Sequence, residues 1–143
     1  MGSPEIPYMK QSVVGIVDPH VSVSSDVAAA LSRAGYTPRT AHTFGDAIAM
    51  MTIVEPEAMV VSLELGAYNG LHVLLRTAVD YPATRVIVVG PASAPLEDEA
   101  RALGAAAYIA RPVGADTLVD VVNSVLLAPS AAARPAPSHL RHV

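Results

Sequence analysis

Asp18, Ser62, Gly90 and Arg111 each lie just after a short apolar segment of the chain. If these segments are parallel strands, their carboxyl ends meet at one edge of a sheet, where such sheets place their chemistry. A carboxylate, a hydroxyl and a guanidinium would then share one crevice. Together, these groups could bind an oxyanion, hold a cation or attack an electrophile.

The residue types favour binding over catalysis. No histidine, lysine or cysteine beside Ser62 is identifiable as an activator, and an unassisted hydroxyl is a weak nucleophile. Asp18 is a single carboxylate, whereas Mg²⁺ usually takes one or two protein carboxylates together with phosphate oxygens. His20 and His72 lack the spaced partners of a metal site, and Arg111 suits oxyanion binding. We therefore expect no enzyme, no metal and no cofactor.

Local bonding is the simplest expectation for these polar side chains. Ser62 is expected to bond backbone groups of its own loop, as short polar residues often do. Asp18 is expected to bond loop amides or to pair with Arg111 across the crevice, and Glu64 to be solvated. Under this interpretation the crevice is a structural feature.

Five short strand-like segments, four of them apolar, alternate with five segments of helical periodicity. Short alternating units of this kind predict a parallel sheet with helices on both faces. The helix starts are marked by Thr43, by Ser93, and by Ser22, Ser24 or Ser25 as alternative N-caps. We therefore predict an α/β, flavodoxin-like, doubly wound five-stranded sheet, with strands at 12–17, 37–42, 58–61, 85–89 and 105–109.

Length and composition suggest one domain with two extensions. The chain has 143 residues, of which 52% are apolar, and no cysteine. We expect an N-terminal extension at 1–11, a domain at 12–127, and a Pro/Ala-rich flexible tail or linker at 128–143. Disulfides and thiolate sites are excluded.

The charge pattern argues against several partners. The formal net charge is −4, and no cluster of Lys or Arg is present, so direct nucleic-acid binding is not expected. The first residues lack the features of a signal peptide, and no apolar stretch approaches membrane-spanning length. A cytoplasmic protein without membrane contact is expected.

Four motifs, taken together and in this order, resemble the response-regulator receiver domain over about residues 13–127. The resemblance implies the CheY-like fold and a place in two-component signalling or a phosphorelay. Receivers take a phosphoryl group on an aspartate after the third strand, beside a Mg²⁺ site, a Ser/Thr and a lysine. The motifs are Ile16-Val17-Asp18, Pro56 through Leu71 with Gly70 eight residues after Ser62, Val86-Ile87-Val88-Val89, and Ala105 through Pro112.

The matching positions differ from that pattern in four of five groups. The acidic pair reads Asp18-Pro19, the phosphoacceptor position is Ser62, the Ser/Thr position is Gly90 and the lysine position is Arg111. The only lysine in the chain, Lys10, precedes the first strand. The resemblance therefore implies an atypical, degenerate pseudo-receiver that acts through phosphorylation-independent protein contacts.

The resemblance also implies a partner face on the fourth helix, fifth strand and fifth helix. Tyr108 matches the switch aromatic, which we expect to stay in one rotamer and to contact a partner. The Arg111–Pro112 bond is expected to be cis. The partner would be another signalling protein or a second copy in a homodimer, and the expected face comprises Leu96, Glu97, Glu99, Arg101 and Tyr108.

Three alternatives stay open. Asp18-Pro19-His20, Ser62-Leu63-Glu64 and Gly90-Pro91 partly resemble cobalamin-binding motifs, with His20 as the cobalt ligand, but glycines that such motifs need are replaced by Val23 and Pro91. The altered crevice could instead admit another small ligand. The tail could also lead to the output domain of a longer transcription regulator.

Overall fold

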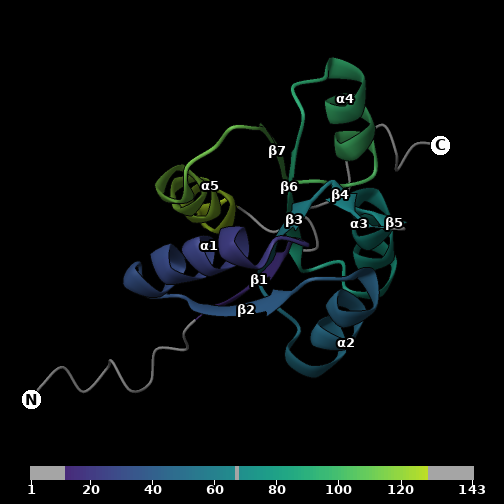
Figure 1. The fold of residues 1–143 in the computed structure, drawn as a ribbon. Coiled ribbons are helices and arrows are strands. Elements are labelled where there is room, and N and C mark those ends of the chain that lie inside the picture. The colour runs from purple at the N-terminus through teal and green to yellow at the C-terminus, as the bar shows by residue number, and fades with distance from the viewer. Residues whose placement is uncertain (1–11, 67, 129–143) are drawn as a thin grey trace, which may run out of the picture.

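Five short segments form the parallel strands of one sheet in the computed structural model, which describes residues 12–66 and 68–128 (Figure 1). All neighbouring pairs are parallel, and the strand order is β2-β1-β3-β6-β7. This is the predicted flavodoxin-like topology. The strands are β1 Val13–Val17, β2 Thr37–Ala41, β3 Ala58–Ser62, β6 Arg85–Gly90 and β7 Ala107–Ala110.

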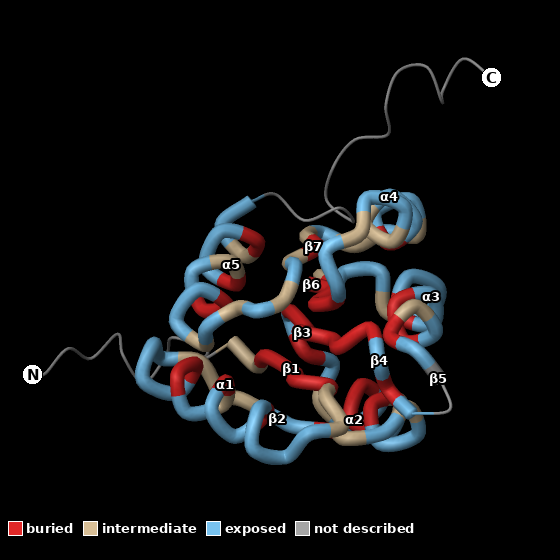
Figure 2. The backbone as a smooth tube through the Cα atoms, turned by 45° about the horizontal axis from the view of Figure 1, so that its top comes forward, coloured by how far each residue is buried: buried red, intermediate tan, exposed pale blue. Residues whose placement is uncertain are grey.

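Five helices cover the two faces of the sheet, so two separate apolar clusters form. One cluster lies between the sheet and α1 and α5, and the other between the sheet and α2, α3 and α4 (Figures 1 and 2). Adjacent strand residues point to opposite faces, and accordingly Val60 belongs to the first cluster and Val61 to the second. The helices are α1 Val21–Arg33, α2 Phe44–Val54, α3 Gly70–Asp80, α4 Ala94–Ala102 and α5 Ala115–Leu127.

Helix starts agree with the sequence in two cases and differ in one. The hydroxyls of Thr43 and Ser93 accept amide hydrogen bonds at the starts of α2 and α4, as predicted. The prediction for α1 is wrong, because that helix begins at Val21 after His20. Ser24 is instead buried within the helix, where its hydroxyl donates to the Val21 carbonyl and bonds to the ring of His42.

The loop after β3 holds a short antiparallel hairpin, which the sequence did not predict. Its strands are β4 Glu64–Leu65 and β5 Tyr68–Asn69. The hairpin returns the chain to β3, where the Gly70 amide donates to the Leu63 carbonyl at 2.6 Å. A Cβ atom at Gly70 would collide with the Ser62 carbonyl oxygen. Glycine is therefore required here because two backbone segments approach closely.

The two expected extensions lie almost entirely outside the described residues. The N-terminal extension at 1–11 is outside the described residues, as is the tail beyond Ala128. In the described part of the chain, no helix combines the length and apolarity that crossing a bilayer requires.

Candidate functional site at the carboxyl edge of the sheet

Three of the predicted polar side chains border one crevice at the carboxyl edge of the sheet. Asp18 follows β1, Ser62 ends β3 and Arg111 follows β7. All three line a cavity of about 220 Å³ whose other lining residues are apolar. Gly90 ends the intervening strand β6, and its carbonyl accepts the Arg111 amide at 2.8 Å. The fold therefore brings the predicted positions together.

Arg111 links the two sides of the Ser62 loop. Its Nη2 donates to the Ser62 Oγ at 2.6 Å, and its Nη1 lies 3.2 Å from the Glu64 Oε1. The Ser62 hydroxyl in turn donates to the Glu64 carbonyl at 3.1 Å. Ser62 is 3% exposed. Its hydroxyl is therefore buried. It donates a hydrogen bond within its own loop, as predicted, and its oxygen accepts one from the guanidinium of Arg111.

Asp18 bonds within its own loop. Its Oδ1 accepts the backbone amide of His20 at 2.8 Å and lies 3.2 Å from the His20 Nδ1. Of the two expectations for Asp18, loop bonding is therefore observed. The ion pair of Arg111 is instead made with Glu64, which was expected to be only solvated. The glutamate remains exposed, so solvent screens this pair.

Tyr108 fills the space beside Gly90. A Cβ atom at Gly90 would lie 2.6 Å from the Tyr108 hydroxyl oxygen, and this hydroxyl donates to the Pro91 carbonyl at 2.6 Å. The ring is buried at 7% exposure, so in this conformation it adds no exposed surface to the expected partner face. Burial raises the pKa of the Tyr108 hydroxyl, an effect that the charge of Arg111 partly offsets.

Sequence reasoning missed two contacts at this edge. Glu64 pairs with Arg111. The only sequence signal for this pair was the position of an acidic residue two residues after Ser62, since its charge is opposite to that of Arg111. The ring of His20 also contacts Asp18, in addition to the expected bond from a loop amide. Neither contact has a recognisable sequence motif.

The arrangement matches a known family. Residues 14–123 match the profile of the response regulator receiver domain. The chain belongs to the response-regulator receiver family. This receiver has no match among curated proteins at a significant level.

Solved structures of other receivers share the fold. The signal receiver domain of a putative Luxo repressor protein from Vibrio parahaemolyticus has a TM-score of 0.77 at 23% identity, over 82% of this chain and 92% of that one. A CheY-like receiver from Methanospirillum hungatei has the same TM-score and identity, with coverages of 82% and 94%. NtrX from Brucella abortus has a TM-score of 0.76 at 26% identity, but the match covers only 28% of that longer chain.

The donor set of this receiver does not fit the Mg²⁺ ion that its family implies. Position 19 is a proline without a side-chain ligand, and the Ser62 hydroxyl already faces a guanidinium. Within residues 12–66 and 68–128, no three His, Cys, Asp or Glu side chains are grouped to hold a metal ion. Asp18 is the one carboxylate among the residues that line the cavity, and the Glu64 carboxylate is already paired with Arg111, so the site gives poor compensation for dehydrating Mg²⁺.

Two other features of the family can be located in this receiver. The Arg111–Pro112 bond is cis, which confirms the expectation from the resemblance. On α4, Glu97 and Arg101 form an ion pair at 3.0 Å, so these two charges of the expected partner face largely compensate each other. Leu96 is partly buried against the core and Glu99 is exposed.

Proposed function

We propose that this receiver domain acts as a pseudo-receiver, which binds a protein partner without accepting a phosphoryl group. The hydrogen bond from Arg111 to Ser62 carries the proposal. By the resemblance of the motifs, Ser62 occupies the position of the acceptor carboxylate. A hydroxyl held by a guanidinium has no base to remove its proton and no cation to draw in a phosphoryl donor.

The surroundings of Gly90 also bear on the family's conformational switch. A receiver normally couples the phosphoryl group to its aromatic residue through a Ser/Thr side chain. Here Gly90 has no side chain, and the Tyr108 hydroxyl occupies the space where one would begin. This geometry supports a single resting conformation of Tyr108. The domain would then present the same surface to its partner whatever the phosphorylation state of the system.

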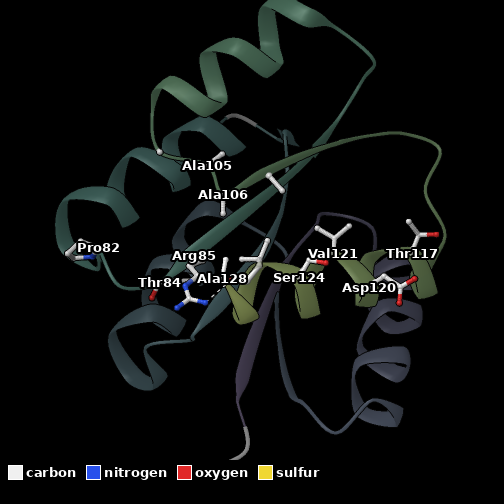
Figure 3. Close-up of a pocket in the computed structure, with 13 residues that line it drawn as sticks. Pro82, Thr84, Arg85, Ala105, Ala106, Thr117, Asp120, Val121, Ser124 and Ala128 are labelled. Atoms are coloured by element: carbon white, nitrogen blue, oxygen red, sulfur yellow. Dashed lines mark hydrogen bonds between the residues drawn. The ribbon is translucent and has the colours of Figure 1, made fainter. Parts of the chain in front are cut away.

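The proposed partner face includes a groove beside the edge strand β7. The groove has a volume of about 690 Å³ and lies between α5, the start of β6 and the residues before β7 (Figure 3). Its floor is made of small residues at 104–107, so a partner's side chains could approach the backbone closely. The proposed partner is another signalling protein or a second copy of the chain, in the cytoplasm and without direct contact to nucleic acid.

The cobalamin alternative is less well supported. The crevice cavity of about 220 Å³ is too small for a corrin ring. His20, the proposed cobalt ligand, is bonded to Asp18 through its ring. No observation on this receiver favours that function over protein binding.

Phosphoryl transfer can be tested directly on the full chain. We expect no covalent adduct after incubation with acetyl phosphate and Mg²⁺, and no rise in melting temperature with beryllofluoride and Mg²⁺, because neither acceptor carboxylate nor cation site is present. Intact-mass spectrometry and thermal unfolding provide the measurements. A receiver with an aspartate at the end of its third strand serves as the positive control.

A reconstructed site provides the matched variant. The combination of Pro19→Asp, Ser62→Asp, Gly90→Thr and Arg111→Lys restores the family's residue types at all four changed positions. If this variant is phosphorylated and the natural chain is not, the loss of phosphoryl transfer is attributable to these four positions. A stoichiometric adduct on the natural chain would overturn the proposal.

A further inference from the structure

We propose that the crevice cavity binds a small uncharged molecule with an apolar body and one hydroxyl group. This goes beyond the proposed function, because it assigns a ligand to the altered site. The cavity is lined by the ends of β1 and β3, the two strands at which the winding direction of the sheet reverses, and also by β6, α1, α5 and the segment after β7. In open α/β sheets, such switch points are the usual place for ligands.

The interior of the cavity is apolar. Nine of its twelve lining residues are Val, Ile, Leu or Pro. Val60, Val89 and Leu118 form buried walls that belong to the cluster under α1 and α5. An apolar cavity of about 150 Å³ suffices for benzene, so a volume of about 220 Å³ suits a body of roughly six to eight carbon atoms.

The cavity has an accessible mouth. Val23 of α1 is 46% exposed, and Pro112 is also exposed. Both residues line the cavity together with Asp18 and Arg111, which are partly buried. An apolar body can therefore enter between α1 and the segment after β7 while its polar group stays at the mouth.

The polar groups at the mouth complement a hydroxyl. A guanidinium has five N–H donors, and the bonds of Arg111 to Ser62 and Glu64 use two of them. Both contacts of His20 fall on the Oδ1 of Asp18, so neither involves its Oδ2. A ligand hydroxyl can accept a hydrogen bond from Arg111 and donate one to Asp18.

Charge decides between a neutral and an ionised ligand. Arg111 and Asp18 line the cavity with one positive and one negative charge. The exposed Glu64, which pairs with Arg111, adds a second negative charge nearby, so these three side chains carry an excess of one negative charge. A carboxylate ligand would add to that excess. An ammonium ligand would be placed against the guanidinium of Arg111. Charges that are removed from water without a partner are costly, so the neutral head group is favoured.

The experiment uses the full chain and three probes of equal length: 1-hexanol, hexanoate and hexylammonium at pH 7. Methyl NMR of the valine and leucine side chains reports where each probe binds. We expect saturable shifts around Val23, Val60 and Leu118 with 1-hexanol at roughly millimolar concentration, as befits so few heavy atoms. Both charged probes should bind at least about tenfold more weakly.

Three variants locate the site. Val23→Phe should fill the mouth and abolish 1-hexanol binding, whereas Val79→Phe, at an exposed position on α3, should leave it unchanged. Arg111→Gln should weaken binding about tenfold through the lost charged hydrogen bond. The proposal would be overturned by any one of three results: no saturable shifts with 1-hexanol, unchanged 1-hexanol binding in Val23→Phe, or tighter binding of a charged probe than of 1-hexanol. Phosphoryl labelling is measured separately, so the two proposals can fail independently.

Discussion

At the scale of single residues, two side chains shape the carboxyl edge of this receiver through the space and the hydrogen-bonding groups that they occupy. Tyr108 occupies the space beside Gly90, and Arg111 occupies the hydrogen-bonding capacity of Ser62. Under the proposed function, the first contact fills the place of the coupling side chain, and the second occupies the hydroxyl at the acceptor position. The two contacts come from the same strand end, since Arg111 lies three residues after Tyr108.

Gly90→Thr tests the exclusion by Tyr108. The new Cβ would lie 2.6 Å from the tyrosine hydroxyl oxygen, so we expect the ring to move outward and to lose its bond to Pro91. Overpacking of this kind costs typically about 1–3 kcal/mol in the free energy of unfolding. Denaturant unfolding gives the stability, and the NMR signals of the ring, assigned by comparison with Tyr108→Phe, give its environment.

Gly45→Thr is the matched control, because a Cβ at that position meets no atom within 4 Å. It should change stability much less than Gly90→Thr. If Gly90→Thr is as stable as the natural chain and leaves the Tyr108 signals in place, the exclusion argument is wrong.

At the scale of elements, the edge strand β7 and helix α5 form the surface that distinguishes this end of the sheet. β7 pairs with β6 on one side only. Alanines at 105–107 line the groove beside α5 (Figure 3). Small side chains leave room for a partner, and an unpaired strand edge is a surface that other chains can contact. The groove, rather than the buried Tyr108 ring, is therefore the testable part of the partner face.

Ala106→Arg tests this face for self-association. The exposed alanine lies in the groove, and an arginine there should block close approach while changing the stability of the monomer by at most about 0.5 kcal/mol. If the partner is a second copy, sedimentation velocity should show concentration-dependent association of the natural chain and of Ala29→Arg, on α1, but not of Ala106→Arg. Association that survives Ala106→Arg would place the interface elsewhere.

At the scale of the whole molecule, the sheet joins two apolar clusters into one folding unit. Met59 of β3 is buried on the side of α2, α3 and α4, and Ile87 of the neighbouring β6 is buried on the side of α1 and α5. Since both clusters are built on the same central strands, neither can unfold without exposing the other. Unfolding should accordingly be a single transition.

Met59→Ala and Ile87→Ala test this coupling. Each should lower the free energy of unfolding by about 2–5 kcal/mol, through lost burial and the cavity left behind. Far-UV circular dichroism and tyrosine fluorescence should report the same midpoint in each variant. Ile53→Ala is the control, because that side chain is 80% exposed, and it should change stability by at most about 0.5 kcal/mol. Two separated transitions would contradict the single unit.

The local sequence was sufficient for the elements and much of the topology. The alternation of short strand-like segments with helical periodicity predicted every strand of the parallel sheet, and Thr43 and Ser93 marked two helix starts. The hairpin at 64–69 and the start of α1 at Val21 were not predicted. Their sequences carry weak signals, and contacts with the rest of the fold decide them. The Gly70 approach to Ser62 is one such contact.

The sequence by itself determined that Asp18, Ser62, Gly90 and Arg111 lie at strand ends, because strand formation depends on neighbouring residues. Only the tertiary structure decided which groups these side chains meet. Arg111 bonds to Ser62 across 49 positions and to Glu64 across 47, and local patterns carry no information on such pairs. Packing also placed the Tyr108 ring against Gly90. A larger residue at position 90 would need the volume that the tyrosine occupies.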